Sequence, residues 1–295
     1  MFWRSHVPRP AAGREYILTL TCTDGPGLVH AVTGYLMKFG ANIMASQQFD
    51  DRLTGKFFMR VHFDAMGAPV TLEELRHGFE EVSQAHAMEF ALVDVATPTR
   101  TLIMVSKFGH CLNDLLFRAR VGTLNIDIAG IVSNHQDYES LAASYEIPYH
   151  HIPVTADTKP AAEAALLDLI DTENVDLIVL ARYMQVLSGS ASRALSGRAI
   201  NIHHSFLPSF KGAKPYHQAH ERGVKLIGAT AHYINDDLDE GPIIEQDVVR
   251  VDHYFDPEEL VAAGRDVETQ VLSRAVKWHC ERRVFPNDGR TVVFR

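Results

Sequence analysis

Hydrophobic and polar positions alternate through the first 95 residues in two similar halves, each pairing strand-like runs with one amphipathic helix. Residues 16–23 alternate as a half-buried strand does, and the turn Asp24-Gly25-Pro26-Gly27 ends that run. Apolar residues at helical spacing then predict a helix over 28–39. The first half is therefore predicted to be a strand followed by a helix.

The second half is predicted to add a hairpin, a second helix and a last strand. Residues 43–49 and 56–63 form the hairpin, and Thr71 with Glu74 has the spacing of a capping box before a helix. Residues 87–95 supply the last strand. This βαββαβ order is that of a ferredoxin-like sheet, so residues 1–95 are predicted as a first domain, with 1–13 as a candidate for disorder.

After a short linker, predicted at 96–100, the hydrophobic pattern changes. Apolar runs now alternate with helix-length segments such as 112–120 and 160–171, and most of the runs are apolar on both faces. This pattern predicts a doubly wound, mainly parallel α/β domain over 101–295, with ligands at the carboxyl ends of its strands. The predicted strands are 101–106, 125–133, 149–154, 175–181, 199–203, 226–234 and 242–251, and 257–283 is predicted to be a closing helix.

Composition and charge narrow the possible partners. The chain has 28 Lys and Arg against 37 Asp and Glu, and this net charge of -9 disfavours a nucleic-acid partner. No apolar run approaches the roughly 20 residues of a membrane span, and no signal-peptide core is evident, so a soluble cytoplasmic protein with no membrane partner is expected. Cys22, Cys111 and Cys280 form no Cys-x-x-Cys pair, so neither a disulfide framework nor a thiolate zinc site is predicted.

Two polar segments follow predicted strands and carry the candidate chemistry. The first begins with Asn201-Ile202-His203-His204-Ser205, and the second runs from His232 to Pro242 and includes Asp239. Imidazole and carboxylate groups are also common metal ligands. Because adjacent strand residues point to opposite faces, however, His203 and His204 are not expected to share an ion, and no metal is predicted.

These two segments resemble the folate-dependent formyltransferase family, whose core motif is Asn-Ile-His followed by Ser and Leu-Pro, with a later His and a Leu-Asp-x-Gly loop. The resemblance implies that Asn201, His203 and Asp239 are catalytic and that His232 supports them. His204 either contributes to the site or caps the strand. The resemblance also implies folate contacts, for which plain core packing is the alternative at the first three positions: Met184, Val186, Leu187, Asn235, Asp236 and Leu238.

Such a triad has a physical rationale. Attack on a formamide carbon creates an oxyanion, which the Asn201 amide or a cationic His203 can stabilise by a few kcal/mol for each well-placed donor. Asp239 can hold that imidazole charged, or it can orient or deprotonate the attacking water and help to protonate the leaving nitrogen. The division of these proton-transfer roles between His203 and Asp239 stays open.

Three features resemble the family members that use water as the acceptor. They are an N-terminal module similar to an ACT domain, the doubled histidine with the run 212–219, and the loop 106–116. This loop has Phe108, His110 and Cys111 where glycines would cradle the phosphate of an amine substrate. The resemblance implies hydrolysis of 10-formyltetrahydrofolate, without a cofactor, to formate for purine synthesis and tetrahydrofolate, balancing the one-carbon folate pools. The alternatives are formyl transfer to an unidentified amine and a purely regulatory folate-binding protein.

The ACT-like module carries a further expectation. ACT modules commonly pair side by side and bind small amino acids near the Gly-rich turn, so the resemblance implies a homo-oligomer, a dimer or a tetramer. A docking or oligomerisation element without a ligand is the alternative. The candidate effector contacts are Asp24, Gly25, Gly27, Leu28 and Asn42.

Overall fold

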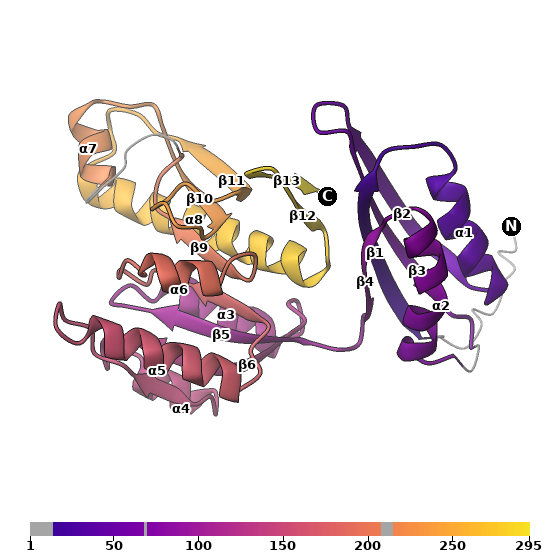
Figure 1. Cartoon of the computed structure of the whole chain (residues 1–295). Coiled ribbons are helices and arrows are strands. Elements are labelled where there is room, and N and C mark those ends of the chain that lie inside the picture. Colours follow the sequence, from indigo (N-terminus) through magenta and orange to yellow (C-terminus); the bar gives the residue numbers. More distant parts are fainter. Residues whose placement is uncertain (1–13, 68–69, 208–214) are drawn as a thin grey trace, which may run out of the picture. The chain divides into compact units, whose positions relative to one another are not determined.

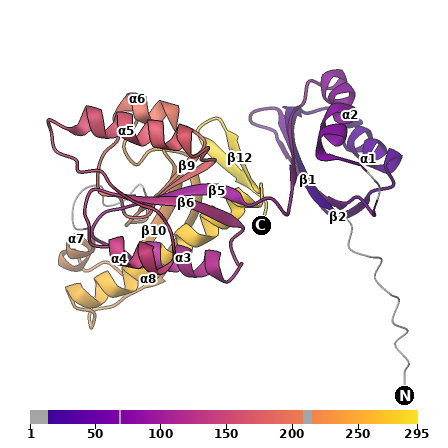
Figure 2. The ribbon, with the colours of Figure 1, turned by 90° about the horizontal axis from the view of Figure 1, so that it is seen from below.

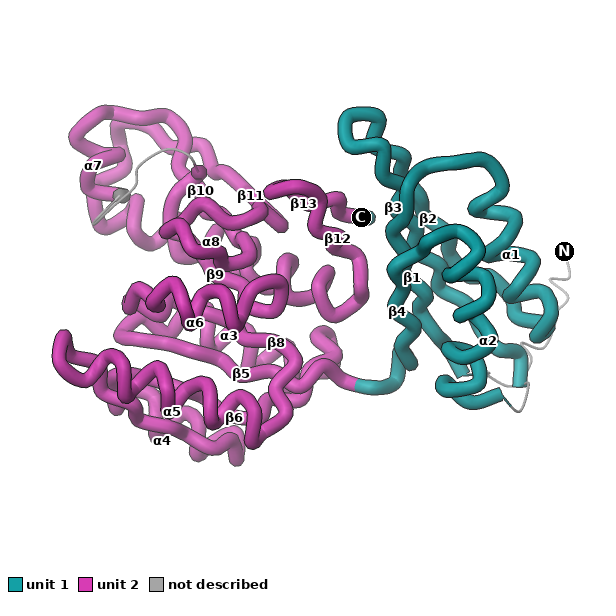
Figure 3. Tube along the Cα trace, viewed as in Figure 1, with its two compact units in different colours: residues 1–97, 294–295 teal, residues 98–293 magenta. Residues whose placement is uncertain are grey.

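The computed structural model describes residues 14–67, 70–207 and 215–295. The chain divides into two compact units, one of residues 1–97 with 294–295 and one of residues 98–293 (Figure 3). The segment 1–13, the candidate for disorder, and the part of the doubled-histidine motif at 208–214 lie outside the described residues. Among the described residues, no helix has the length and apolarity needed to cross a membrane.

Unit 1 is a four-stranded antiparallel sheet in the order β2-β3-β1-β4, with both helices packed on one face (Figure 1). Its elements are β1 (Glu15–Thr23), α1 (Leu28–Lys38), β2 (Asn42–Asp51), β3 (Lys56–Asp64), α2 (Leu72–Ala85) and β4 (Glu89–Asp94). The predicted βαββαβ fold is confirmed. Alternation in β1 places Tyr16, Leu18 and Leu20 in one core with the helices.

The second helix of unit 1 begins where its sequence provides a cap. The Thr71 side chain accepts a hydrogen bond from the Glu74 backbone N–H, and the Glu74 carboxylate accepts one from the Thr71 backbone N–H. Two N–H groups that lack partners within the helix are thereby satisfied. The capping box predicted from these two residues is present.

Unit 2 contains the remaining elements. They are β5 (Thr99–Val105), α3 (His110–Arg120), β6 (Ile126–Ser133), α4 (Glu139–Ser144), β7 (Tyr149–His151), α5 (Lys159–Thr172), β8 (Leu177–Leu180), α6 (Gly189–Ala194), β9 (Ala199–His203), α7 (Pro215–Glu221), β10 (Leu226–Tyr233), β11 (Ile243–Arg250), α8 (Pro257–Cys280), β12 (Val284–Asn287) and β13 (Arg290–Val293).

The central sheet of unit 2 has seven strands in the order β11-β10-β9-β8-β5-β6-β7. The five strands from β9 to β7 are parallel, whereas β10 and β11 run antiparallel to their neighbours. Helices α3, α4 and α8 cover one face of the sheet, and α5 and α6 cover the other (Figure 2). The predicted doubly wound, mainly parallel α/β fold is confirmed.

The strand order reverses between β5 and β8, because the chain passes from β5 outward to β6 and β7 and then returns to β8 on the other side. Loops at the carboxyl ends of such neighbouring strands form a crevice where ligands bind in open α/β sheets. Ser106, which follows β5, forms hydrogen bonds to the segment that follows β8. Its backbone N–H donates to the Arg182 carbonyl at 3.1 Å, and its hydroxyl accepts from the Met184 N–H at 3.0 Å.

The structure differs from the sequence prediction at several short elements. Strand β5 begins at Thr99, inside the predicted linker 96–100, because it already pairs there with β6. The closing helix ends at Cys280 and not at 283, and the hairpin of β12 and β13 follows it. Helices α4, α6 and α7 were not predicted, since six or seven residues contain too few turns to show a helical period.

Candidate active site

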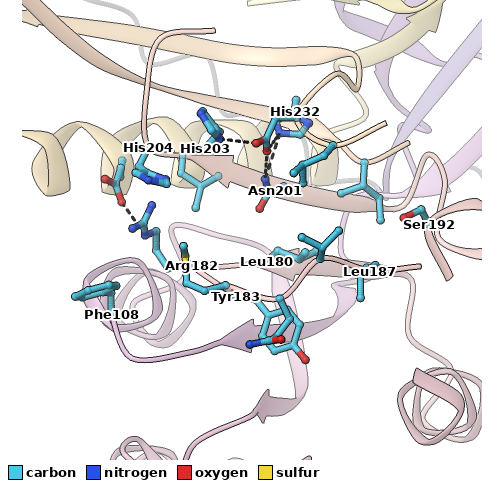
Figure 4. Close-up of a pocket in the computed structure, with 18 of the residues that line it drawn as sticks. Phe108, Leu180, Arg182, Tyr183, Leu187, Ser192, Asn201, His203, His204 and His232 are labelled. Carbon is cyan, nitrogen blue, oxygen red and sulfur yellow. Dashed lines mark hydrogen bonds and ion pairs between the residues drawn. The ribbon is translucent and has the colours of Figure 1, made fainter. Parts of the chain in front are cut away.

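A cavity of about 580 Å³ lies beyond the carboxyl ends of β8 and β9. Its walls come mainly from the segment after β8, the end of β9, the loop after β10 and one face of α8, and the loop after β5 with parts of α6 and α7 completes them. In Figure 4, Asn201, His203, His204 and His232 lie along one wall, with Arg182 and Phe108 toward one end and Leu187 and Ser192 toward the other. The three residues predicted to be catalytic, Asn201, His203 and Asp239, all line this cavity.

Asn201 lies on β9 directly opposite His232 of β10 in the antiparallel register. Its side-chain nitrogen Nδ2 is 3.2 Å from His232 Nε2 and donates a second, longer hydrogen bond of 3.5 Å to Asp239 Oδ1. Sheet pairing therefore fixes the amide beside two other polar groups of the site.

The ring orientation of His232 follows from its neighbours. Its Nδ1 lies 2.9 Å from the Tyr233 carbonyl oxygen, which can only accept, so Nδ1 carries the proton. Its Nε2 lies 3.2 Å from the Asn201 amide nitrogen and 3.7 Å from Asp239 Oδ1. His232 is 2 % exposed, and its contact with Asn201 fixes the orientation of the Asn201 side chain.

His203, the last residue of β9, uses both ring nitrogens. Its Nδ1 is 3.1 Å from Asp239 Oδ2, and its Nε2 is 2.9 Å from the Ser205 hydroxyl oxygen. Because a carboxylate only accepts, Nδ1 is the donor in the first contact. The ring is therefore held in one orientation by Asp239 on one side and Ser205 on the other.

Asp239 lies on the loop after β10 in a left-handed conformation, with φ of 58°. The loop folds tightly back on the strand, since a Cβ atom at Gly241 would lie only 1.6 Å from the Tyr233 carbonyl oxygen. Burial acts to raise the pKa of Asp239, but the hydrogen bonds and charges of His203 and His232 outweigh it, and the pKa is lowered. The carboxylate is thus ionised at neutral pH.

A second set of charged groups lies toward the Phe108 end of the cavity. Glu268 of α8 is 1 % exposed and accepts hydrogen bonds from His110 Nε2 at 2.8 Å and the Tyr216 hydroxyl at 2.7 Å. Arg182 Nε lies 3.3 Å from the same carboxylate. Gly264, one turn earlier on α8, leaves room for the Tyr216 ring, because a Cβ atom there would come within 2.1 Å of it.

His204 also lines the cavity, so the argument that adjacent histidines must face opposite sides is wrong here. Strand β9 ends at His203, and alternation does not continue into His204. The two ring centroids are 5.2 Å apart. Burial, followed by the positive charge of Arg182, lowers the pKa of His204 to about 4, so its imidazole is neutral at pH 7.

The residues predicted to contact folate form much of the remaining wall: Met184, Val186, Leu187, Asn235, Asp236 and Leu238. Met184 and Val186 are 50 % and 55 % exposed, which is incompatible with plain core packing. Leu187 packs partly against the core under α5 and lines the cavity as well. Asp236 accepts a hydrogen bond of 2.8 Å from Arg193.

The sequence of this chain is similar to that of known enzymes over nearly its whole length. The profile of the formyl transferase family matches residues 99–276, and that of the ACT domain matches residues 16–76. A formyltetrahydrofolate deformylase from Corynebacterium sp. (strain P-1) is 57% identical over 281 residues, which cover 95% of this chain and 98% of that protein. This chain belongs to the formyltetrahydrofolate deformylase family.

Solved structures agree with membership of the deformylase family. The crystal structure of formyltetrahydrofolate deformylase from Burkholderia mallei matches with a TM-score of 0.91 and 55% identity, covering 96% of this chain and all of that one. Glycinamide ribonucleotide transformylase 1 from Symbiobacterium toebii matches with a TM-score of 0.65 and 29% identity, covering 70% of this chain and 98% of that one. The deformylase family thus shares its catalytic fold with enzymes named for transfer to an amine.

Within this deformylase-family cavity, sequence reasoning missed Arg182 and Glu268. Arg182 follows a buried apolar strand directly, where a charged residue signals a site at the strand end. Glu268 lies on the core-facing side of α8, at helical spacing from Gly264, Val271 and Leu272. An acidic residue at a core position of a helix is rare, and this could have marked Glu268 as a candidate in the sequence.

The loop after β5 carries the three bulky residues that stand where glycines would cradle a phosphate, and two of them line the cavity. Phe108 and His110 line the cavity. Cys111 does not: it is 1 % exposed in the core beneath α3, and burial raises the pKa of its thiol. The first turn of a helix points successive side chains in different directions, which removes Cys111 from the wall.

Among the described residues, His110, Cys111 and Glu268 form a group whose potential ligand atoms lie within 4.8 Å of one another. The Arg182 guanidinium contacts the same carboxylate, so a metal cation there would face a fixed positive charge. The high pKa of the Cys111 thiol also opposes the thiolate that a metal would need.

The candidate effector residues lie in unit 1 at the turn after β1 and at the start of β2. Asp24 and Asn42 are exposed. Leu28 is buried in the core of unit 1, so only its backbone is available for a ligand.

Proposed function

We propose that this chain hydrolyses 10-formyltetrahydrofolate to formate and tetrahydrofolate, with water as the nucleophile. The observation that carries the proposal is the contact of Asp239 with both His203 and Asn201 on the wall of a 580 Å³ cavity. Membership of a family whose relatives are named formyltetrahydrofolate deformylase gives the substrate.

In the proposed reaction, water oxygen bonds to the formyl carbon and the carbonyl oxygen becomes an oxyanion. The Asn201 amide is the proposed oxyanion donor, because its hydrogen bond to Asp239 is long, at 3.5 Å, and the same hydrogen can be donated to the oxyanion instead. The electron pair of the oxyanion then re-forms the carbonyl as the bond from carbon to N10 breaks, and the formic acid released loses its remaining proton to solvent and becomes formate.

The proton that water loses must reach N10 of the leaving tetrahydrofolate. Asp239 is ionised and hydrogen-bonded to His203, so the pair can accept this proton and then donate it to the nitrogen. The two groups share their proton through one contact of 3.1 Å, and we treat them as a single acid–base unit. No step of this scheme uses a metal or a cofactor.

The proposed acceptor is water because bulky and charged side chains line the Phe108 end of the cavity and leave little room for an amine substrate. Phe108, His110 and the buried pair of Arg182 with Glu268 occupy this part of the wall. A fixed guanidinium charge also disfavours a cationic amine at this end. These groups favour hydrolysis over the alternative of transfer to an amine, and an assembled acid–base pair argues against a purely regulatory protein.

The remaining proposals concern context. Formate released in this way would supply purine synthesis and balance the one-carbon folate pools, and we place the protein in the cytoplasm. The ACT-type unit is proposed to form a dimer or tetramer and to bind a small amino acid through Asp24, Gly25, Gly27, Leu28 and Asn42. Equilibrium dialysis with labelled glycine and other small amino acids tests the last point, with Asn42→Ala as the variant expected to weaken binding.

The function is tested by incubating the purified full chain with 10-formyltetrahydrofolate and measuring formate and tetrahydrofolate together. Equal amounts of both products are expected, and candidate amines should change neither. An Asp239→Asn preparation at the same concentration controls for contaminating activity. Release of tetrahydrofolate only when an amine is present would contradict the proposal.

A further inference from the structure

Arg182 is a buried cation that takes part in none of the bond-making or proton-transfer steps proposed above. Its side chain is 8 % exposed and lines the cavity, and its backbone has a φ of 68°, in the left-handed region that favours glycine. A non-glycine residue in this conformation is strained, and such strain is found at functional sites. The guanidinium is therefore held in the cavity wall at a conformational cost.

The groups around Arg182 do not provide hydrogen-bond acceptors for all of its N–H groups. Its Nε and Nη1 are buried and have no hydrogen-bond acceptor among the described residues. The Glu268 carboxylate, at 3.3 Å, already accepts hydrogen bonds from His110 and Tyr216. Buried N–H groups of a charged side chain rarely stay unpaired in native proteins, so an acceptor from outside the chain is indicated.

The other charged or titratable neighbours favour an anion as that acceptor. Arg265 approaches the same Phe108 ring as Arg182, with guanidinium carbons 5.4 Å and 5.6 Å from the ring centroid. His204 adds no negative charge, and Glu268 is the only carboxylate within ion-pair distance of Arg182 among the described residues. Phe108, which is 41 % exposed, covers one approach to the guanidinium and has room to move.

We propose that Arg182 binds the formate released in the reaction, and so provides a product site beside the acid–base pair. This inference rests on the proposed function, which generates formate in the same cavity. Formate is small, planar and anionic, and its two oxygens can accept from the guanidinium in a charge-assisted contact.

The test measures binding of ¹³C-labelled formate by NMR line width, with the full chain saturated with tetrahydrofolate. Ionic strength is held constant with a bulky sulfonate buffer. Arg182→Gly suits the left-handed backbone and removes the guanidinium, and it should weaken formate binding at least about tenfold. Arg182→Lys keeps a positive charge beside Glu268, which protects folding, but it lacks the planar fork and should weaken binding several-fold.

Arg265→Ala is the matched control, because Arg265 approaches the same Phe108 ring but is exposed. Its formate affinity should fall less than in either Arg182 variant, because the charge of an exposed side chain is screened by solvent. Wild-type affinity in both Arg182 variants, or an equal loss in Arg265→Ala, would overturn the inference. Formate production from 10-formyltetrahydrofolate is assayed separately, so a wild-type protein that makes formate but does not bind it through Arg182 refutes this inference alone.

Discussion

Among the carboxylates that line the cavity, Asp239 and Glu268 have different surroundings. Asp239 lies on a loop and contacts two imidazoles and an amide, whereas Glu268 lies on the long helix α8 and contacts an imidazole, a phenol and a guanidinium. Burial acts to raise both pKa values, and the hydrogen-bond donors outweigh it in both cases. Both groups are therefore ionised, yet only Asp239 contacts two residues of the predicted catalytic set.

The difference lies in what each carboxylate can do with a proton. The partner of Asp239 is His203, and imidazole is the side chain that most often serves as a general acid or base. Glu268 lies beside Arg182, which keeps its charge at any ordinary pH, and is sealed from solvent. We infer that the first carboxylate serves proton transfer and that the second fixes the wall of the cavity.

The largest effect should come from Asp239→Asn. Asparagine keeps the shape but cannot accept a proton, so turnover should fall at least about 10²-fold, the usual scale for a positioned acid or base. Binding of tetrahydrofolate should change little. Steady-state kinetics and a folate-binding titration check both points, and turnover within a few-fold of wild type would remove Asp239 from proton transfer.

His203→Ala and Asn201→Ala should each reduce turnover by a similar factor of about 10². If the three residues act as one unit, each double variant with Asp239→Asn should lose less than the product of the two single losses. The measurement is a double-mutant cycle on kcat. Fully multiplicative losses would mean that the residues act independently, against their direct contacts.

Glu268→Gln should affect stability more than chemistry. Removing one charge of a buried ion pair leaves Arg182 uncompensated, and the free energy of unfolding should fall by about 3 kcal/mol. Turnover of the folded fraction should fall much less than in Asp239→Asn. Denaturant unfolding beside kinetics gives both values, and the reverse pattern would exchange the roles assigned to the two carboxylates.

A smaller effect is expected on the pH dependence of folding stability, through protonation of His204. Its pKa is lowered to about 4, whereas the unfolded chain takes up this proton near pH 6.5. The unfolded state therefore binds more protons between these values, so this contribution to stability is complete above pH 6.5 and is lost as the pH falls toward 4. The lowered pKa values of Asp239 and Glu268 contribute stability that is lost as the pH falls below about 5, so between pH 6.5 and 5 the effect of His204 is separate from theirs.

His204→Asn should flatten the dependence of unfolding free energy on pH between 6.5 and 4, by up to about 1.4 kcal/mol per pH unit. Buried His279, whose pKa is also lowered to about 4, should give a second contribution of the same sign. Urea unfolding at several pH values measures the slope. An unchanged slope in His204→Asn would show that this ring is not held neutral in the folded chain.

Much of this architecture could be predicted from the sequence, because strands and long helices repeat their pattern over several turns or alternations. The βαββαβ unit and the mainly parallel sheet follow from such runs. Asn201, His203 and Asp239 could be grouped because two polar segments that follow predicted strands contain them. The antiparallel pairing that sets His232 of β10 opposite Asn201 of β9 is seen only in the structure.

Contacts between distant elements could not be predicted in the same way. Glu268 meets His110 across 158 residues, and no local pattern pairs them. His203 and His204 line the same wall because β9 ends at His203. The exact residue at which a strand ends is difficult to predict from sequence. Cys111 was misplaced for a related reason, since the orientation of a first helical turn is set by tertiary packing.

The central claim is that water receives the formyl group, and the oxygen of the product tests it most directly. The reaction is run in ¹⁸O-labelled water with 10-formyltetrahydrofolate and excess glycinamide ribonucleotide, and an enzyme-free sample corrects for spontaneous hydrolysis. We predict one labelled oxygen in each formate, an equal amount of tetrahydrofolate, and no formylated amine. Formylated amine in amounts comparable to formate, or formate without label, would contradict the account.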